Sequence, residues 1–276
     1  MGTQPLAGPA RNDAVPATEV EDANSRSALI KRIDRGQLTW FGPLLLIVGR
    51  SVLIIAAQAV TAGWLWLRFG SWSWNAAAEW WTVYGTLVDV GCLALMAAYT
   101  RKEGISLRDL IGRVRLRWGR DLFLGAGVLL LVFPFFFLAV LAASWMVWGT
   151  VQPQLYPGLL AGRALPLWGV IYSLSVWWLI WSPTEEMTYN AYALPRLEAL
   201  FGSKWKAVAV VGFWWALQHC FIPLILDWKY IVWRFLAFLP GVVAFTLLYL
   251  RVRRLSPFIV AHWPMDIYAA LLTLKF

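Results

Sequence analysis

Long apolar runs separated by short polar segments dominate the chain from about residue 40 onward. Each run is long enough to cross about 30 Å of hydrocarbon as an α-helix. The runs are too long for the strands of a membrane barrel and do not alternate polar with apolar residues. Seven segments fit this description: residues 40–67, 74–99, 122–148, 165–189, 205–226, 230–250 and 255–274. The pattern predicts an all-α membrane protein, built as a bundle of about seven transmembrane helices.

The composition agrees with this pattern. The chain has 276 residues, of which 60% are hydrophobic and 20 are Trp. Average soluble domains are only about 45–50% apolar. This excess, together with a mean hydropathy of +0.62, places the chain among integral membrane proteins and argues against an ordinary soluble domain.

The basic residues indicate an orientation for the bundle. If the N-terminus is cytoplasmic and all seven runs cross the membrane, 18 Lys and Arg residues lie on the cytoplasmic side and 5 on the opposite side. Cytoplasmic loops of membrane proteins carry such an excess. The split therefore predicts a cytoplasmic N-terminus. It also accounts for the net charge of +9. The expected partner of the basic residues is a lipid bilayer, and no nucleic acid is needed to explain them.

The pattern divides the chain into two regions. Residues 1–37 are polar, rich in Ala, Pro, Asp, Glu and Arg, and hold too little apolar surface to offset the entropy of ordering. We expect them to form a disordered cytoplasmic tail, and they lack the apolar core of a secretory signal peptide. Residues 38–276 form the polytopic membrane domain, with a motif-bearing core at about residues 165–275.

Ionisable side chains gather in three of the predicted helices, namely the fourth, fifth and seventh apolar runs. Glu185 and Glu186 lie in the fourth run, where each charge costs about 2.5–3.5 kcal/mol on insertion scales, so a functional use is expected. The only histidines, His219 and His262, fall in the fifth and seventh runs, and Asp266 shares a helix face with His262. At 1.5 Å per residue these groups lie roughly 12–21 Å from the cytoplasmic helix ends. We expect them to converge in one cavity that opens toward the cytoplasm.

These groups suit hydrolysis, which needs a base to activate water and a donor to stabilise the developing oxyanion. A Glu–His pair can deprotonate the water, and a second His can donate to the oxyanion. A zinc site at Glu185, His219 and His262 is the competing interpretation. The chain lacks the HExxH spacing, and histidines on separate helices are compatible with either account. Asp89 in the second run is interpreted as structural, because neighbouring glycines indicate a tight helix contact.

The order of these motifs resembles a known family. EExxxR on one helix, FxxxH on a later one and HxxxN or HxxxD near the end is the pattern of the CPBP family. Its members are intramembrane proteases related to the type II CAAX prenyl endopeptidase, including bacteriocin-processing and immunity-type (Abi) proteins. Here the motifs read EEMTYN at 185–190, WALQH at 215–219 and HWPMD at 262–266, on the fourth, fifth and seventh predicted helices. The stretch YALPRLE at 192–198 also resembles the family.

The resemblance implies a glutamate-dependent intramembrane endopeptidase, without a metal or other cofactor, in a bacterial inner membrane. Its substrate would be a peptide or lipidated protein cut near the cytoplasmic face. By this likeness Glu185 activates water together with His219. His262 and Asp266 shape the oxyanion site, and Glu186 supports the first acid.

The chain departs from the family pattern at three positions, and the change of the second motif's Phe to Trp215 is a modest one. The family's Arg is Asn190 here, four residues beyond Glu186, where an Arg would pair with the carboxylate. Asp266 stands where Asn is often found; an ionised Asp would repel an oxyanion, so Asp266 is either protonated or acts by orienting His262. Two alternatives to the protease stay open. The first is a non-catalytic membrane scaffold or immunity-type protein, which Asn190 favours. The second is a small transporter whose buried acids relay protons. The absence of an internal repeat argues against the transporter.

Overall fold

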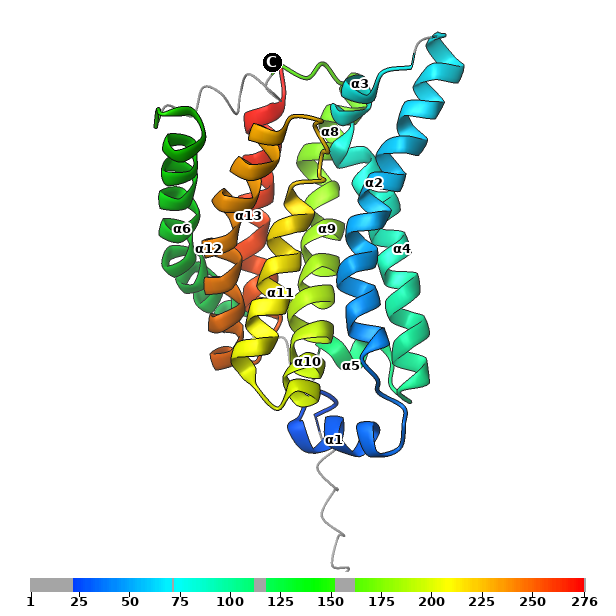
Figure 1. The fold of residues 1–276 in the computed structure, drawn as a ribbon, viewed down its shortest axis with the longest axis vertical. Helices are drawn as coiled ribbons and strands as arrows, with labels where there is room; N and C mark the ends of the chain where they lie inside the picture. The colour runs from blue at the N-terminus through cyan, green and yellow to red at the C-terminus, as the bar shows by residue number, and fades with distance from the viewer. Residues whose placement is uncertain (1–21, 71, 112–117, 152–161, 276) are drawn as a thin grey trace, which may run out of the picture.

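The computed structural model describes residues 22–70, 72–111, 118–151 and 162–275, and the regular structure of this part of the chain is helical (Figure 1). The helices are α1 (Arg26–Asp34), α2 (Phe41–Phe69), α3 (Trp74–Ala78), α4 (Trp81–Lys102), α5 (Leu107–Ile111), α6 (Trp118–Trp148), α8 (Leu167–Ser175), α9 (Trp177–Glu186), the π-helix η1 (Met187–Ala193), α10 (Leu194–Phe201), α11 (Lys204–His219), α12 (Trp228–Val252) and α13 (Ser256–Thr273). The expected all-α class is confirmed.

Among the described residues, four helices are long and apolar enough to cross a membrane: α2, α4, α12 and the part of α6 from Gly119 to Trp148. Large apolar side chains face outward from the bundle, with Phe123 79% and Leu130 75% exposed. Such surfaces are typical of contact with lipid, and the chain is an integral membrane protein. The other expected runs are also helical, as α8–α10, α11 and α13. They are interrupted, shorter or less apolar, so their crossing of the membrane stays a prediction.

The acid-bearing segment runs through the middle of the bundle (Figure 1). The continuous run α9, η1 and α10 lies between the α2–α4 pair on one side and α11, α12 and α13 on the other, and α6 packs on α12 and α13. Helices α1, α5 and α10 lie at one end of the bundle, and the C-terminus lies at the opposite end. Helices on both sides of α9 can therefore project side chains toward its acids.

Two prolines bracket the acid-bearing segment. Pro183 lies inside α9, and Pro195 lies in the first turn of α10. Because proline has no backbone N–H, it leaves a carbonyl of the preceding turn without its helical partner. The carbonyl of Ala191, four residues before Pro195, accepts a hydrogen bond of 2.9 Å from the side-chain amide of Asn24. The helix continues through η1 and α10, beyond the expected end at residue 189, and π-helical turns of this kind often occur at functional sites.

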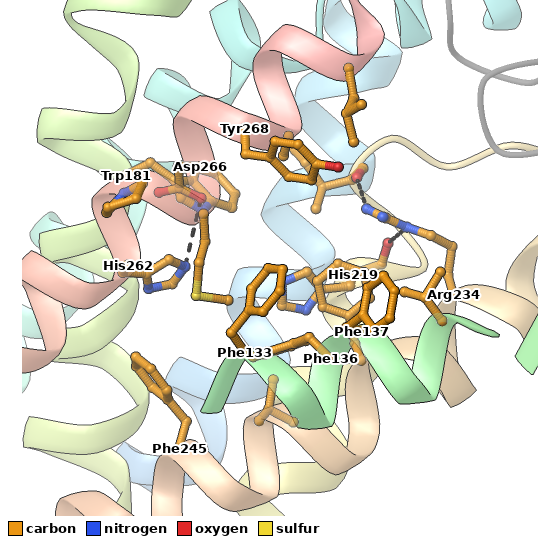
Figure 2. Close-up of a pocket in the computed structure, with 18 of the residues that line it drawn as sticks. Phe133, Phe136, Phe137, Trp181, His219, Arg234, Phe245, His262, Asp266 and Tyr268 are labelled. Atoms are coloured by element: carbon orange, nitrogen blue, oxygen red, sulfur yellow. Dashed lines mark hydrogen bonds and ion pairs between the residues drawn. The ribbon is translucent and has the colours of Figure 1, made fainter. Parts of the chain in front are cut away.

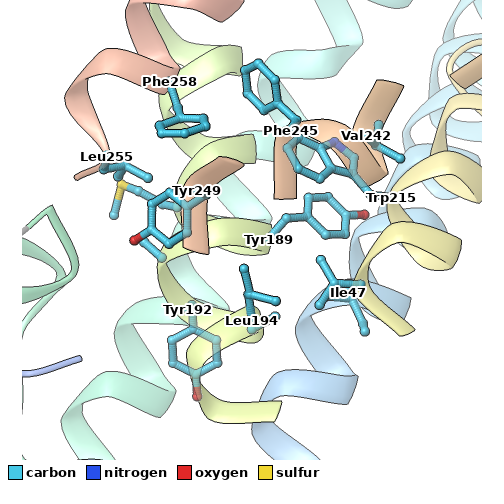
Figure 3. Packing of buried hydrophobic residues seen from close by; sticks show 14 of the residues in the cluster. Ile47, Tyr189, Tyr192, Leu194, Trp215, Val242, Phe245, Tyr249, Leu255 and Phe258 are labelled. Atoms are coloured by element: carbon cyan, nitrogen blue, oxygen red, sulfur yellow. The ribbon is translucent and has the colours of Figure 1, made fainter. Parts of the chain in front are cut away.

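Aromatic packing fixes η1 against α11. The ring of Tyr189 stacks on the indole of Trp215, with ring centroids 5.0 Å apart and planes 4° from parallel (Figure 3). Phe245 of α12 meets the same indole edge-on at 5.9 Å. All three side chains are buried in one apolar cluster. Buried aromatic pairs contribute about 0.5–1.5 kcal/mol beyond their area burial, so this packing holds the second sequence motif in place beside the first.

The fifth apolar run ends as a helix earlier than expected. Residues 205–226 were expected to be one helix, but α11 ends at His219. Pro223 explains the difference, since proline cannot donate a helical hydrogen bond and disfavours helical backbone in the residue before it. His219 therefore lies at the C-terminal end of its helix.

The predicted disordered tail of residues 1–37 is corrected in its second part. Residues 1–21 lie outside the described residues. Residues 22–37 contain α1, which begins after Ser25, whose side chain caps the first turn. Leu29 of α1 is buried, with 2% of its surface exposed.

Ion pairs explain why this segment is ordered despite its low apolar content. Arg32 of α1 and Arg196 of α10 both bind the carboxylate of Glu103 at the end of α4, at 2.8 and 2.7 Å. The three side chains are nearly or fully buried. Charge pairing between distant segments, which an apolar count does not detect, thus attaches α1 to the bundle.

We predict that Glu103→Gln destabilises the fold by about 3–5 kcal/mol, because it leaves two buried arginines without their shared carboxylate. Chemical unfolding in detergent micelles measures this change. Glu198→Gln is the matched control, since Glu198 pairs with Arg253 at a partly exposed site, and this variant should cost at most about 1 kcal/mol. Equal losses in the two variants would contradict the prediction.

Candidate active site

Glu185 and Glu186 are the last two residues of α9 and have no exposed surface. Glu185 faces α11. Its Oε1 accepts hydrogen bonds from the indole N–H of Trp215 and from Nε2 of Gln218, the latter at 2.5 Å, and lies 3.7 Å from Nε2 of His219. Residues three and four apart share one helix face, so a single face of α11 surrounds this carboxylate.

The orientation of His219 is fixed by its own helix. Nδ1 lies 2.7 Å from the carbonyl oxygen of Trp215, and a carbonyl can only accept, so Nδ1 carries a proton. In the neutral ring, Nε2 therefore presents its lone pair toward Glu185. The ring also stacks on Phe238, with centroids 3.9 Å apart. Two proton acceptors, Glu185 Oε1 and His219 Nε2, thus face each other at a distance that suits a shared water better than a direct bond.

Glu186 points to the other side and has a partner for each oxygen. Oε1 accepts from Nδ1 of His262 at 3.0 Å, and Oε2 accepts from Nδ2 of Asn190 at 2.7 Å. Asn190 therefore supplies a hydrogen bond where the family Arg would supply a charge. The substitution does not leave Glu186 without a partner.

Asp266 completes the cluster from α13. Its Oδ1 lies 3.6 Å from Nε2 of His262, one helical turn away, and its Oδ2 accepts a hydrogen bond from the hydroxyl of Ser182 on α9. His262 is thus placed between two carboxylates, Glu186 on one ring nitrogen and Asp266 near the other. The structure brings the predicted site residues together as two linked acid–histidine pairs.

A cavity of about 440 Å³ lies beside these residues, with walls from α6, α9, α11, α12 and α13 (Figure 2). The walls are mostly apolar and rich in aromatic side chains, which include Phe133, Phe136, Phe137, Trp181 and Phe245. His219, His262 and Asp266 also line the cavity, whereas Glu185 and Glu186 do not. A molecule in the cavity meets the histidines first, and the glutamates lie behind them.

The cavity extends away from the end of the bundle that was expected to be cytoplasmic. Tyr268 and Leu272, which line it, follow His262 along α13 toward the C-terminus, at the end of the bundle remote from α1 (Figure 1). Under the orientation that the basic residues predict, this is the non-cytoplasmic end. The buried cluster that contains Trp215, Tyr192 and Leu194 (Figure 3) explains the difference, because it fills the bundle around η1 and α10, which lead from the site to α1.

Two polar residues next to Glu185, Arg50 and Gln218, were missed by the sequence interpretation of the site. Arg50 of α2 lies 3.8 Å from Glu185 Oε2, donates to Asp89 of α4 at 3.1 Å and donates to Gln218 at 2.9 Å. Asp89 has the structural role expected of it, as the partner of this arginine. Opposite charges within two apolar runs were an available signal, since such charges usually pair inside the bundle.

A metal centre was the competing interpretation of the same side chains. Within the described ranges, no three His, Cys, Asp or Glu side chains converge in a way that could hold a metal ion. Nδ1 of His262 is engaged by Glu186 and Nδ1 of His219 by a carbonyl, which leaves one nitrogen on each ring for a ligand. Zinc binding at Glu185, His219 and His262 is therefore tested by the chelator in the cleavage assay below.

Comparison with known proteins agrees with the motif pattern. Residues 166–268 match the family model described as Rce1-like, type II CAAX prenyl endopeptidase Rce1-like. The match spans both glutamates, both histidines and Asp266, and it confirms the resemblance of this part of the chain to a CAAX protease-like family. That family is one of peptide hydrolases. No curated protein and no solved structure matches the chain.

We predict that Asn190→Leu lowers the free energy of unfolding by about 1.5–3 kcal/mol, because it removes a hydrogen bond to a buried acid while keeping the side-chain volume. Unfolding in detergent micelles measures the loss. Thr188→Val serves as the control: Thr188 is equally buried but donates only to a neutral carbonyl of its own helix, worth about 0.5–1.5 kcal/mol. If Asn190→Leu costs no more than Thr188→Val, Asn190 does not support Glu186.

Proposed function

We propose that the protein is an intramembrane endopeptidase that hydrolyses a peptide bond in a glutamate-dependent reaction. The observation that carries the proposal is the approach of two proton acceptors, Glu185 Oε1 and His219 Nε2, to 3.7 Å beside a cavity that the histidine lines. Neither atom is the other's hydrogen-bond donor when the ring is neutral. A water molecule that enters between the two groups from the cavity can donate to His219 Nε2 and to the Glu185 carboxylate, which is the arrangement that general base catalysis needs.

In this reaction the water oxygen attacks the carbonyl carbon of the scissile bond. One water proton passes to the Glu185–His219 pair, and the carbonyl oxygen becomes an oxyanion. Collapse of the tetrahedral intermediate breaks the C–N bond, and the proton is returned to the leaving nitrogen. The products are one peptide with a new carboxyl terminus and one with a new amino terminus, without a covalent enzyme intermediate.

The second acid–histidine pair is proposed to stabilise the oxyanion. Glu186 accepts from Nδ1 of His262 and so fixes the ring, which directs Nε2 toward the cavity beside Asp266. A proton on Nε2 makes His262 a donor to the developing charge. Asp266, held by Ser182, orients this ring, and Glu186 acts through His262 without contacting the substrate.

The cavity walls bear on the substrate and its location. They are apolar apart from a few side chains at the site, which favours a peptide or lipidated protein that enters from the lipid bilayer. We expect a bacterial inner membrane as the location. Cleavage at the depth of the two histidines fits the geometry; cleavage near the cytoplasmic face, expected from the sequence, gains no support from a cavity that extends the other way.

The alternative of a non-catalytic scaffold or immunity-type protein was motivated by Asn190. Because Asn190 still binds Glu186, its presence no longer separates the two functions. Binding without cleavage would be the signature of the scaffold, and the cleavage experiment below reports it directly.

We predict that the purified protein cleaves members of a peptide library, and that Glu185→Gln or His219→Ala lowers the cleavage rate by about 10²–10⁴-fold, the usual contribution of a general base. Mass spectrometry of the products measures the rate. Glu198→Gln is the matched control, since Glu198 is a partly exposed acid of α10. This variant should cleave the peptides at the wild-type rate.

The same assay separates the competing accounts. Cleavage that survives Glu185→Gln would rule out the proposed mechanism. Peptide binding by wild type and both variants, with no cleavage by any, would identify the scaffold. Loss of wild-type cleavage on adding a chelator, with recovery on adding zinc, would favour the metal site.

A further inference from the structure

Arg50 is a fully buried arginine of α2 that is held from two sides. Its guanidinium lies over the ring of Trp181, 4.2 Å from the ring centroid, and Nη1 donates to Asp89 at 3.1 Å. Trp181 precedes Glu185 by one turn of α9. Nη2 lies 3.8 Å from Glu185 Oε2, an oxygen that accepts no hydrogen bond from the described residues. The fixed guanidinium thus directs its free amino group toward the acid proposed to activate water.

Gln218 connects the same arginine to the other oxygen of Glu185. Its Oε1 accepts from Nε of Arg50 at 2.9 Å and from the hydroxyl of Tyr189 at 3.1 Å. A flipped amide would turn its own N–H groups toward these two donors, so the amide has only one favourable orientation. In that orientation Nε2 must donate to Glu185 Oε1, as it does at 2.5 Å.

We infer that Arg50 is a positioning residue for Glu185. Its contact with Gln218 fixes the amide N–H that donates to Oε1, and its positive charge attracts Oε2. The carboxylate is therefore kept in line with His219. Arg50 lies outside the segment matched by the family model, so the inference gives α2 a part in the site. It rests on the proposed function only in naming Glu185 as the reacting acid.

The positioning can be measured without any catalysis through Trp215, whose indole N–H donates to Glu185 Oε1. Nitrogen–proton correlation spectra of Trp-labelled protein in micelles report this group, and Trp215→Phe assigns its peak. We predict that Arg50→Met and Gln218→Leu both displace the Trp215 resonance. Arg254→Met is the matched control and should leave it in place, because Arg254 pairs with Asp121 at a separate site.

Arg50→Met leaves Asp89 buried without its partner, so the single variant alone can fail to fold. The double variant Arg50→Met with Asp89→Asn removes both charges, and the other Trp resonances report whether it is folded. We predict that the double variant also displaces the Trp215 peak. Its kcat should fall about 10- to 100-fold, as for loss of a group that orients a reacting residue, while KM stays near the wild-type value. Arg50→Lys should recover part of kcat, since it keeps the charge but not the forked contacts.

The outcomes distinguish this inference from the proposed function. A displaced Trp215 resonance with reduced kcat supports both. An unmoved resonance or a wild-type kcat in the folded double variant overturns the role of Arg50 and leaves the protease intact. A displaced resonance in a protein whose wild type cleaves nothing overturns the protease and supports the positioning.

Discussion

The burial of two carboxylates is the constraint on which this bundle depends. Glu185 and Glu186 have no exposed surface, and each buried ion costs several kcal/mol unless well-placed partners offset it. The partners come from separate helices: Arg50 from α2, Gln218 from α11 and His262 from α13. The interactions that make the acids tolerable in a membrane are therefore the same ones that hold the helices around them. Stability and the proposed chemistry share one set of contacts.

The residues of the site could be predicted where helix geometry alone decides the answer. The four-residue spacing of His262 and Asp266 and the depths of the histidines follow from the fixed rise and turn of a helix. The choice of neighbouring helices does not, because it is set by side-chain packing that apolar runs leave unspecified. Arg50 and Gln218 were missed for this reason, although each lies within a run that was recognised.

Tertiary contacts also decided where the sequence interpretation was wrong. The prolines around α9 and η1 are visible in the sequence, but the Ala191 carbonyl before Pro195 accepts a hydrogen bond from Asn24, which belongs to a segment expected to be disordered. The direction of the cavity likewise depends on which part of the bundle the buried cluster with Trp215 and Tyr192 fills. Composition indicates how many aromatic residues a chain has, and only packing shows which space they occupy.

Water activation between Glu185 and His219 is the central claim, and oxygen-18 water tests it most directly. A single turnover is run in labelled water, and both the product and the peptide that contains Glu185 are weighed by mass spectrometry. The account predicts one labelled oxygen in the new carboxyl terminus of the product and none in Glu185. An unlabelled product with the label in Glu185 would mean that the carboxylate itself attacks the substrate, and would contradict the account.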